Sequence, residues 1–268
     1  MTLRNTFTVG LLSLFAITAL VPMTASADAV TKGNEVAAEW NRRDLGFGDT
    51  RATMEMVLEN RNGQTSTRRM RMSTLEVPNP DEGDKTLTVF QHPRDIKGTA
   101  FLSFSHINDP DDQWLYLPAL KRVKRISSKN KSGPFVGSEF AYEDLSAQEL
   151  KKYTYTSIRE EACGELTCAV IEQVPTYENS GYTKMVVWYD LAEYRQQKID
   201  YYDRKKQLVK TLEFSNFQQH LDKYWRAYDM FMVNHQTGKK TRLVFSKYEF
   251  QIGLKERDMT KNALKRIR

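Results

Sequence analysis

Histidine is scarce in this 268-residue chain, and residue types that often perform catalysis are not grouped into motifs. No two histidines stand at the short spacing of metal-binding motifs, and there is no Gly-x-Ser-x-Gly nucleophile elbow, phosphate-binding loop or dinucleotide fingerprint. The four histidines are His92, His106, His220 and His235. We therefore predict no catalytic residue, no metal and no cofactor, and we expect that the protein is not an enzyme.

One acidic group has the oxygen ligands that calcium prefers: Asp109, Asp111 and Asp112 surround a proline. The alternative is a solvated turn, and it is the interpretation that we favour.

Cysteine is almost absent, since the chain contains only Cys163 and Cys168. An even number of closely spaced cysteines in a secreted protein indicates a disulfide, which here would close a tight loop between two strands. The alternative is a metal or redox pair. A single Cys-x4-Cys without a second pair or a nearby histidine is a poor zinc site, so we predict the disulfide.

Long apolar runs are absent apart from one, Val9 to Val21. This run follows Arg4 and precedes Ala25-Ser26-Ala27, so we predict a secretory signal peptide at residues 1–27, cleaved after Ala27 or alternatively after Ala29. A transmembrane anchor is the other interpretation, but the run is shorter than the roughly 20 residues that span a bilayer. No cysteine lies near the cleavage site, so we expect no lipid anchor.

The remaining residues, 28–268, contain no linker rich in Pro, Gly or Ser, and we expect them to form one domain. The mean hydropathy of −0.61 argues against further membrane spans. In the whole chain, with the predicted signal peptide and its Arg4 included, 40 Lys and Arg outnumber 34 Asp and Glu, which gives a formal net charge of +6.

Hydrophobic periodicity predicts a mainly β protein with a few helices. Val36, Ala37 and Trp40 stand at helical spacing within residues 30–42, which predicts one amphipathic helix. From there apolar residues alternate with period two, and Asn62-Gly63 marks a hairpin turn. We expect about ten or eleven antiparallel strands in a strongly curved sheet with helices on its concave side.

The β pattern stops in the middle of the chain, at residues 129–146. A short helix is expected near residues 142–150, and another at residues 259–266 with Asp258 as its cap.

Methionine and aromatic residues are abundant, with 10 Met, 13 Phe, 13 Tyr and 4 Trp. Met54 and Met56 alternate on one expected strand and Met70 and Met72 on its partner, so all four would share one face. Because methionine is flexible and polarizable, such a face adapts to irregular apolar partners, including acyl chains. An ordinary sheet core is the other interpretation and the one we favour for any single residue, whereas the number of such residues favours a cavity.

A basic segment, Lys121–Lys131, carries six Lys and Arg residues and no acid. One interpretation is a solvated edge strand whose charges prevent aggregation. The other is a contact to lipid phosphates or to an acidic partner, for which we expect Arg122 and Arg125 because a guanidinium matches phosphate and carboxylate geometry. The same pattern is typical of nucleic-acid binding, but in a secreted protein we expect no nucleic-acid partner.

Two segments resemble a known family. Trp114–Arg125 is an aromatic strand that runs through Pro118 into the basic strand, and Gly137–Leu145 has the sequence GSEFAYEDL. Together they resemble the LolA/LolB superfamily of periplasmic lipid and lipoprotein carriers, and within it the longer LolA-like branch of outer membrane lipoprotein-sorting proteins. Gly98–Leu102 and Tyr182–Asp190 are similar to the same family.

The resemblance implies an incomplete barrel with helices as a lid over an apolar cavity, and a monomeric periplasmic carrier. Such a carrier would take the acyl chains of a lipoprotein or lipid from an inner-membrane transporter, of the RND/MMPL or ABC type, towards the outer membrane. The segment near Phe140 and Tyr142 is expected to be the moving lid. The residues expected to line the cavity have large apolar or aromatic side chains: Met54, Met56, Met70, Leu102, Phe104, Trp114, Tyr116, Phe140 and Tyr142.

Two other functions stay open at this point. One is an accessory subunit of an RND/MMPL-type transporter, which docks through the basic strand and carries no cargo. The other is an envelope enzyme whose histidines and carboxylates come together only in the folded chain. Co-purification without lipid would favour the first, and a cluster of such groups in space would favour the second.

Overall fold

The computed structural model describes residues 24–79 and 82–267. The predicted signal peptide lies, up to residue 23, outside the described residues. Helix α1 (Thr24–Asp44) contains the predicted helix 30–42 and begins earlier, so the predicted cleavage site at Ala25-Ser26-Ala27 falls in its first turn. Val36 and Ala37 are buried, which confirms the predicted apolar side of the helix.

The described residues then form thirteen strands in one antiparallel sheet, more than the expected ten or eleven. The order across the sheet is β6-β5-β4-β3-β2-β1-β13-β12-β11-β10-β9-β8-β7. The strands are β1 (Asp49–Glu59), β2 (Thr65–Leu75), β3 (Glu82–His92), β4 (Ala100–His106), β5 (Asp112–Leu117), β6 (Arg122–Ile126), β7 (Tyr153–Cys163), β8 (Leu166–Pro175), β9 (Tyr182–Asp190), β10 (Gln196–Asp203), β11 (Leu208–His220), β12 (Tyr224–Asn234) and β13 (Lys240–Phe250).

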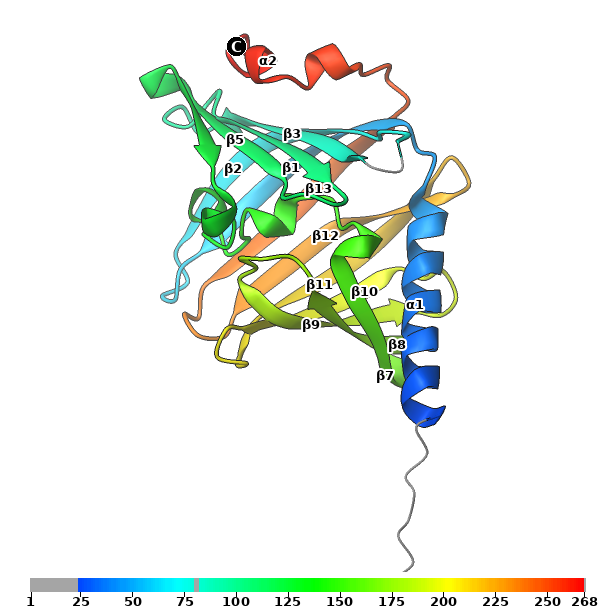
Figure 1. Cartoon of the computed structure of the whole chain (residues 1–268). Helices are drawn as coiled ribbons and strands as arrows, with labels where there is room; N and C mark the ends of the chain where they lie inside the picture. Colours follow the sequence, from blue (N-terminus) through cyan, green and yellow to red (C-terminus); the bar gives the residue numbers. More distant parts are fainter. Residues whose placement is uncertain (1–23, 80–81, 268) are drawn as a thin grey trace, which may run out of the picture.

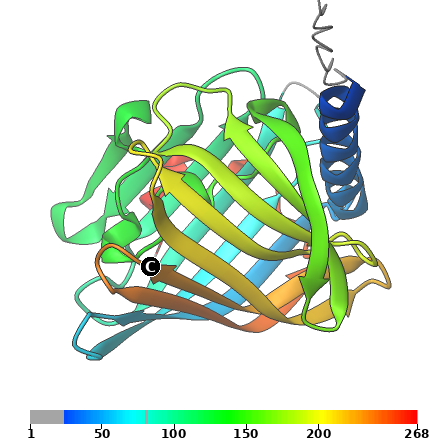
Figure 2. The ribbon, with the colours of Figure 1, turned by 90° about the horizontal axis from the view of Figure 1, so that it is seen from below.

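The sheet curls into a half-barrel that does not close, because its edge strands β6 and β7 do not pair with each other (Figures 1 and 2). The incomplete barrel predicted from the sequence is therefore confirmed. Residues 127–152, which we name the plug segment, connect the two edges. In place of a helix at 142–150 they form four short 3-10 turns: η2 (Ser128–Asn130), η3 (Phe135–Gly137), η4 (Glu143–Leu145) and η5 (Leu150–Lys152).

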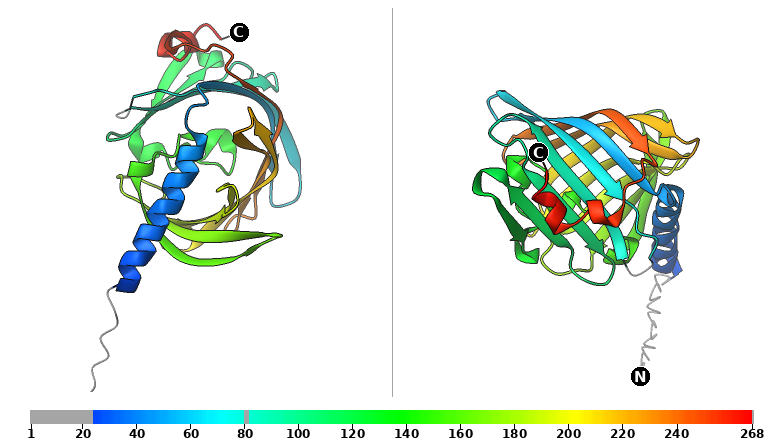
Figure 3. Two further views of the ribbon diagram at one scale, coloured as in Figure 1. Left: turned by 90° about the vertical axis from the view of Figure 1, so that its right-hand side faces the viewer. Right: turned by 90° about the horizontal axis from the view of Figure 1, so that it is seen from above.

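Helix α1 lies against the edge strand β7 and crosses one end of the half-barrel (Figure 3, left). The contact is close because Gly33 has no side chain: a Cβ placed there would lie 2.8 Å from the backbone carbonyl of Tyr155. Near the end of the helix, Trp40 packs on Tyr189 with ring centroids 5.9 Å apart. Within residues 24–79 and 82–267, no helix combines the length and the apolar character needed to cross a membrane.

The two faces of the sheet bury different residues. The concave face holds the main core, which includes Met54, Phe101 and Leu243. On the convex face, strands β3–β5 are covered by the C-terminal segment, whose Met259 and Leu264 pack there (Figure 1). This segment forms η6 (Glu256–Asp258) and α2 (Lys261–Leu264), a shorter helix than predicted.

The prediction that Asp258 caps the C-terminal helix is wrong. The side chain of Thr260, not that of Asp258, accepts a hydrogen bond from the first turn of α2. The Asp258 carboxylate instead accepts a hydrogen bond from the backbone N–H of Lys255, which closes the preceding turn η6.

Candidate functional site

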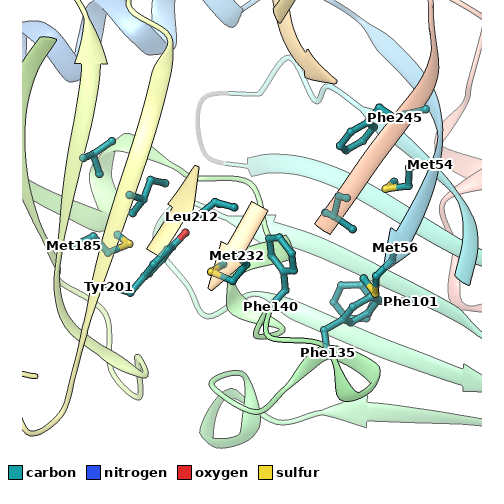
Figure 4. Close-up of a cluster of buried hydrophobic side chains, with 14 of the residues drawn as sticks. Met54, Met56, Phe101, Phe135, Phe140, Met185, Tyr201, Leu212, Met232 and Phe245 are labelled. Atoms are coloured by element: carbon teal, nitrogen blue, oxygen red, sulfur yellow. The ribbon is translucent and has the colours of Figure 1, made fainter. Parts of the chain in front are cut away.

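The concave side of the half-barrel contains a cavity of about 330 Å³, which we name the interior cavity. Small-molecule sites usually measure about 300–1,000 Å³, so the cavity lies at the lower end of that range. Figure 4 shows methionine and aromatic side chains from several strands pointing into this region. Its apolar lining includes Met54, Met56, Met70, Met72, Phe135, Phe140, Met185, Ile199, Tyr201, Leu212, Phe214, Met230, Leu243 and Phe245.

The methionines come together because of strand register. Met54 on β1 lies opposite Met70 on β2, and every second residue of a strand faces the same side. Met72 therefore joins them two residues further along β2, and Met185 and Met230 add to the lining from β9 and β12. The predicted shared face of the first four methionines is confirmed.

Polar side chains line another part of the same cavity, among them Thr74, Thr86, Thr88, Ser146, Gln148 and Gln196. Gln148 of the plug segment donates to Gln173 at 2.6 Å and accepts from Gln196 at 3.1 Å. Both Gln173 and Gln196 also donate to the Tyr189 hydroxyl. Burial raises the pKa of Tyr189, so this hydroxyl stays neutral. The network gives the cavity a hydrogen-bonding part of its wall, through Gln148 and Gln196.

The interior cavity continues towards the end of the half-barrel that α1 crosses. It shares Met72, Gln196 and Phe214 with an adjoining hollow of about 330 Å³, which extends to Trp40 on α1. A further hollow of about 520 Å³ shares Gln148 with the cavity and extends to the end of α1. We name these two hollows the mouth, since they adjoin the cavity and are lined in part by residues of α1.

The mouth carries both charges and rings. Arg195 pairs with the buried Asp190 at 2.8 Å, and its guanidinium lies 4.7 Å from the centre of the Trp225 ring. Arg226 pairs with Asp44 at the end of α1. The indole N–H of Trp225 is buried and has no hydrogen-bond partner among the described residues. The wall of the mouth therefore contains one buried hydrogen-bond donor without a partner among the described residues.

Asp84 lines both hollows of the mouth. Burial raises its pKa to about 7, and the negative charges of Glu149, Glu76 and Asp44 act in the same direction. A hydrogen bond of 3.2 Å from the backbone N–H of Val77 opposes the shift only in part. A carboxyl group at the mouth is thus neutral for much of the time near neutral pH.

The plug segment crosses the concave side and closes part of it with aromatic rings. Phe135 is fully buried and stacks on Phe90, with ring centroids 5.8 Å apart. The same ring meets Phe101 and Tyr142 edge to face, at 5.3 and 5.5 Å. Phe140 is also buried and lines the interior cavity. These contacts resemble a packed core, because ring pairs at such distances add to the stabilisation from burial alone.

Polar contacts fix the plug segment to the sheet. Asp144 is 3% exposed and pairs with Lys210 of β11, 5% exposed, at 2.5 Å. The Asp144 carboxylate also accepts from the Tyr182 hydroxyl at 2.7 Å and from the Ala141 backbone N–H at 2.6 Å. Lys210 donates in addition to the backbone carbonyl of Glu139.

Further anchors reach other strands. The Glu139 side chain accepts from Asn234 of β12, its backbone N–H donates to Thr241 of β13, and Arg68 of β2 donates to the carbonyl of Val136. Within the described residues the segment 136–144 is thus bound to strands on both halves of the sheet. Its bonding favours a fixed plug, and the expected moving lid near Phe140 and Tyr142 has no support in this geometry.

The expected cavity residues separate into two groups. Met54, Met56, Met70 and Phe140 line the interior cavity, and Tyr142 packs beside it on Phe101 and Phe135. Leu102, Phe104, Trp114 and Tyr116 lie on the convex face, in the cluster covered by Met259 and Leu264.

The placement of these last four residues in the cavity is therefore wrong, and the reason is strand parity. Leu102 pairs with Trp114, and Phe104 stacks edge to face on Trp114, all on the face opposite to Phe101. A shift of one residue along a strand exchanges the two faces. The sequence offers apolar residues at both parities here, so alternation alone could not distinguish the faces.

The basic segment forms the edge of the sheet. Arg122 is exposed on β6, whereas Arg125 forms an ion pair with Asp112 of β5. Lys131 at the end of the segment is buried, with its amine 3.6 Å from the centre of the Tyr177 ring. Burial lowers the pKa of Lys131.

The predicted disulfide between Cys163 and Cys168 is present, with Cα atoms 5.8 Å apart, at the turn between β7 and β8. The alternative calcium interpretation of the acidic group has no support, since Asp111 pairs with the buried Lys152 and Asp112 with Arg125. No group of three or more His, Cys, Asp or Glu side chains in the described part of the chain is placed to hold a metal ion.

Sequence reasoning missed Lys210, Tyr182 and Asn234 as partners of the plug segment. Their partners Glu139 and Asp144 lie within Gly137–Leu145, the segment already singled out. The signal that could have found them is the position of Lys210 on the inward parity of β11, two residues before the buried Leu212. A lysine at that parity needs a buried acidic partner.

Comparison with known proteins agrees with this architecture. A family model described as "Uncharacterized protein" matches residues 82–266. A search of curated proteins finds no match. The chain is 58% identical to an outer membrane lipoprotein-sorting protein domain from Vibrio parahaemolyticus, with a TM-score of 0.86 over 88% of this chain and 99% of that one.

Two further structures are similar. A DUF1329 family protein from Desulfovibrio piger has 27% identity and a TM-score of 0.83, over 88% of this chain and 99% of that one. A LolA superfamily protein from Nitrosomonas europaea has 17% identity and a TM-score of 0.67, over 89% and 98%, which shows the common fold. The chain therefore belongs to the family of outer membrane lipoprotein-sorting protein domains, and it shares the fold of the LolA superfamily protein.

Proposed function

We propose that this protein is a periplasmic carrier that shields acyl chains of a lipoprotein or lipid in the interior cavity. The observation that carries the proposal is the methionine-lined cavity, which adjoins the mouth beside α1. The relative from Vibrio parahaemolyticus, described as an outer membrane lipoprotein-sorting protein domain, supports the same class of cargo. Transfer from an inner-membrane RND/MMPL-type or ABC-type transporter to the outer membrane is the expected route.

The energetics suit a carrier, because burial of acyl chains is favourable and the size of the cavity limits how much of a chain is buried. Each CH2 group that leaves water gains about 0.8 kcal/mol, and the volume of about 330 Å³ limits how many groups fit without rearrangement. The charged side chains at the mouth, such as Arg195 and Arg226, suit the polar part of the same molecule. The cargo would thus lie with its chains towards the methionines and its polar group towards the mouth.

Native mass spectrometry with lipid extraction, on protein purified from periplasm, is the first experiment. Bound phospholipid, other acyl lipid or acylated peptide would support the proposal and identify the cargo class. A mass of protein alone, unchanged after incubation with lipid vesicles, would contradict it.

A variant that fills the cavity locates the binding site. Thr88 is buried on β3 and lines the interior cavity, so Thr88→Trp should abolish binding of a fluorescent fatty acid. Thr67→Trp makes the same change at an exposed position of β2 and should bind as the wild type does. Thermal unfolding of both variants checks that they are folded. Equal probe binding by a folded Thr88→Trp variant would exclude the interior cavity as the site.

The plug segment favours one alternative, an accessory subunit of an RND/MMPL-type transporter without cargo. Phe135 and Phe140 already fill part of the concave side, which reduces the space left for a ligand. Co-purification of a transporter with a lipid-free protein, together with no uptake of the fatty-acid probe, would favour this function over the carrier.

A further inference from the structure

The hairpin of β5 and β6 projects from the edge of the sheet and ends in the exposed turn η1 (Pro118–Leu120) (Figure 1). Leu120 at this tip is 62% exposed, the highest exposed fraction among the exposed large apolar side chains of the described residues. Lys121 follows it in a left-handed conformation, with φ of 48°. The turn therefore places an apolar side chain at the outermost point of the hairpin.

Positive charge surrounds this tip. Lys121, Arg122, Lys124 and Lys129 are exposed and form no ion pair within residues 24–79 and 82–267, whereas Arg125 is paired with Asp112. The register places Arg125 opposite Trp114 and Lys124 opposite Leu115, so basic side chains extend from both faces of the edge strand.

The C-terminal helix adds to the same surface. The amine of Lys261 on α2 lies 5.3 Å from the centre of the Trp114 ring, on the face that Arg125 shares. The sequence from Gln113 to Ser138 contains six basic residues and no acidic one. The hairpin is therefore a cationic surface with one projecting leucine.

We propose that the β5–β6 hairpin docks the protein on the surface of an anionic phospholipid bilayer, with Leu120 inserted between headgroups and Lys121, Arg122 and Lys124 on the lipid phosphates. Projecting apolar residues flanked by Lys and Arg are the arrangement that binds membrane interfaces. The proposal goes beyond the carrier function and does not depend on what the interior cavity holds.

The shape of the surface favours a bilayer over an acidic protein. A stable protein interface needs a contiguous, well-packed apolar centre. Residues 118–129 line neither the interior cavity nor the mouth. A single projecting side chain with separated cations matches a fluid, negatively charged surface, which adapts its own shape.

Sedimentation with vesicles tests the proposal, using phosphatidylcholine alone and phosphatidylcholine mixed with phosphatidylglycerol. The wild type should bind only the mixed vesicles. Binding should fall as salt rises from 0.1 to 1 M, because the Debye length falls from about 10 Å to about 3 Å. Arg122→Ala should weaken binding about fivefold, equivalent to ~1 kcal/mol for one cation at a membrane. Leu120→Ser should weaken it about fifteenfold, equivalent to about two buried CH2 groups.

The controls remove one exposed leucine and one exposed cation at turns elsewhere in the chain. Leu221 is 54% exposed between β11 and β12, and Leu221→Ser should bind the mixed vesicles as the wild type does. Lys205→Ala, at the exposed turn between β10 and β11, is the control for Arg122→Ala. These positions are exposed, so unfolding is not expected, and thermal unfolding verifies this.

The outcomes separate this proposal from the carrier function. The cavity-filled Thr88→Trp variant should still sediment with mixed vesicles, and Leu120→Ser should still bind the fatty-acid probe. Equal binding of wild type and hairpin variants, or no binding of wild type to mixed vesicles, would overturn membrane docking. Loss of a co-purifying acidic protein on Arg122→Ala, without vesicle binding by the wild type, would overturn it in favour of a protein partner.

Discussion

The ion pair of Lys210 and Asp144 holds the plug segment on β11, so its removal should destabilise the protein. Lys210→Met keeps the length of the side chain but leaves the Asp144 carboxylate, 3% exposed, without its cation. Removing one partner of a buried pair costs about 3–5 kcal/mol. Because Asp144 keeps hydrogen bonds from Tyr182 and Ala141, we expect the lower value, about 3 kcal/mol.

Thermal and denaturant unfolding measure this change. A domain of about 150–250 residues loses about 2–4 °C of Tm per kcal/mol, so Tm should fall by roughly 6–12 °C. Lys184→Met is the matched control, since Lys184 pairs with Glu172 at a half-exposed site of β9. A pair of that kind contributes at most about 1 kcal/mol. Binding of the fatty-acid probe should also weaken in Lys210→Met, because the plug segment forms part of the cavity wall.

The double variant Lys210→Met/Asp144→Leu distinguishes an ion pair from two independent contacts. When both charges are absent no buried charge remains, so much of the lost stability should return. The reasoning would be refuted if the free energy of unfolding of Lys210→Met stayed within about 1 kcal/mol of the wild-type value. It would also be refuted if the double variant lost the sum of the two single effects.

Three further predictions concern other parts of the chain. Gly33→Ala should lower Tm, because the new Cβ would lie 2.8 Å from the β7 backbone. At an unhindered helix position the same change would stabilise the protein by about 1 kcal/mol. Asn34→Ala, at an exposed position of α1, is the control and should leave Tm nearly unchanged. The pKa of Asp84 is about 7 in the folded protein and about 3.9 in an unfolded chain. The protonated Asp84 carboxyl therefore stabilises the fold fully below pH 4, and this stabilisation is lost as the pH rises through 7. Chemical denaturation from pH 4 to 8 should therefore show Asp84→Asn more stable than the wild type at pH 8, by up to about 4 kcal/mol, and parallel pH curves would contradict this. Replacing Cys163 and Cys168 by Ser should cost about 2 kcal/mol from the short loop that they close, without loss of fatty-acid binding, and a loss of binding would show that the turn does more than stabilise the hairpin.

Local sequence patterns predicted helices and strands of this fold, but they did not predict the number of strands or the length of every helix. The helical spacing of Val36, Ala37 and Trp40 and the hairpin signal Asn62-Gly63 depend on neighbours in sequence, and both predictions are confirmed. The predicted helix near residues 142–150 was wrong, because the backbone there follows contacts to distant strands, such as that of Asp144 with Lys210.

Alternation of residue types could not assign the inner and outer faces of strands β4 and β5. Phe101 and Leu102 are both apolar and both fully buried, one under the plug segment and the other under the C-terminal segment. A strand that is covered on both sides has no polar face to fix its orientation. The C-terminal segment therefore decided that Leu102 and Trp114 are outer core and that Phe101 is inner core.

The sequence by itself determined the class of fold, the disulfide, the family and the methionine face of β1 and β2, because each depends on residue types at short and fixed spacing. Only the tertiary structure decided how the sheet curls, which side of β4 and β5 meets the cavity, and that residues 127–152 form a bonded plug. These features depend on contacts between residues far apart in the chain, whose pairing follows from register and burial and not from local propensity.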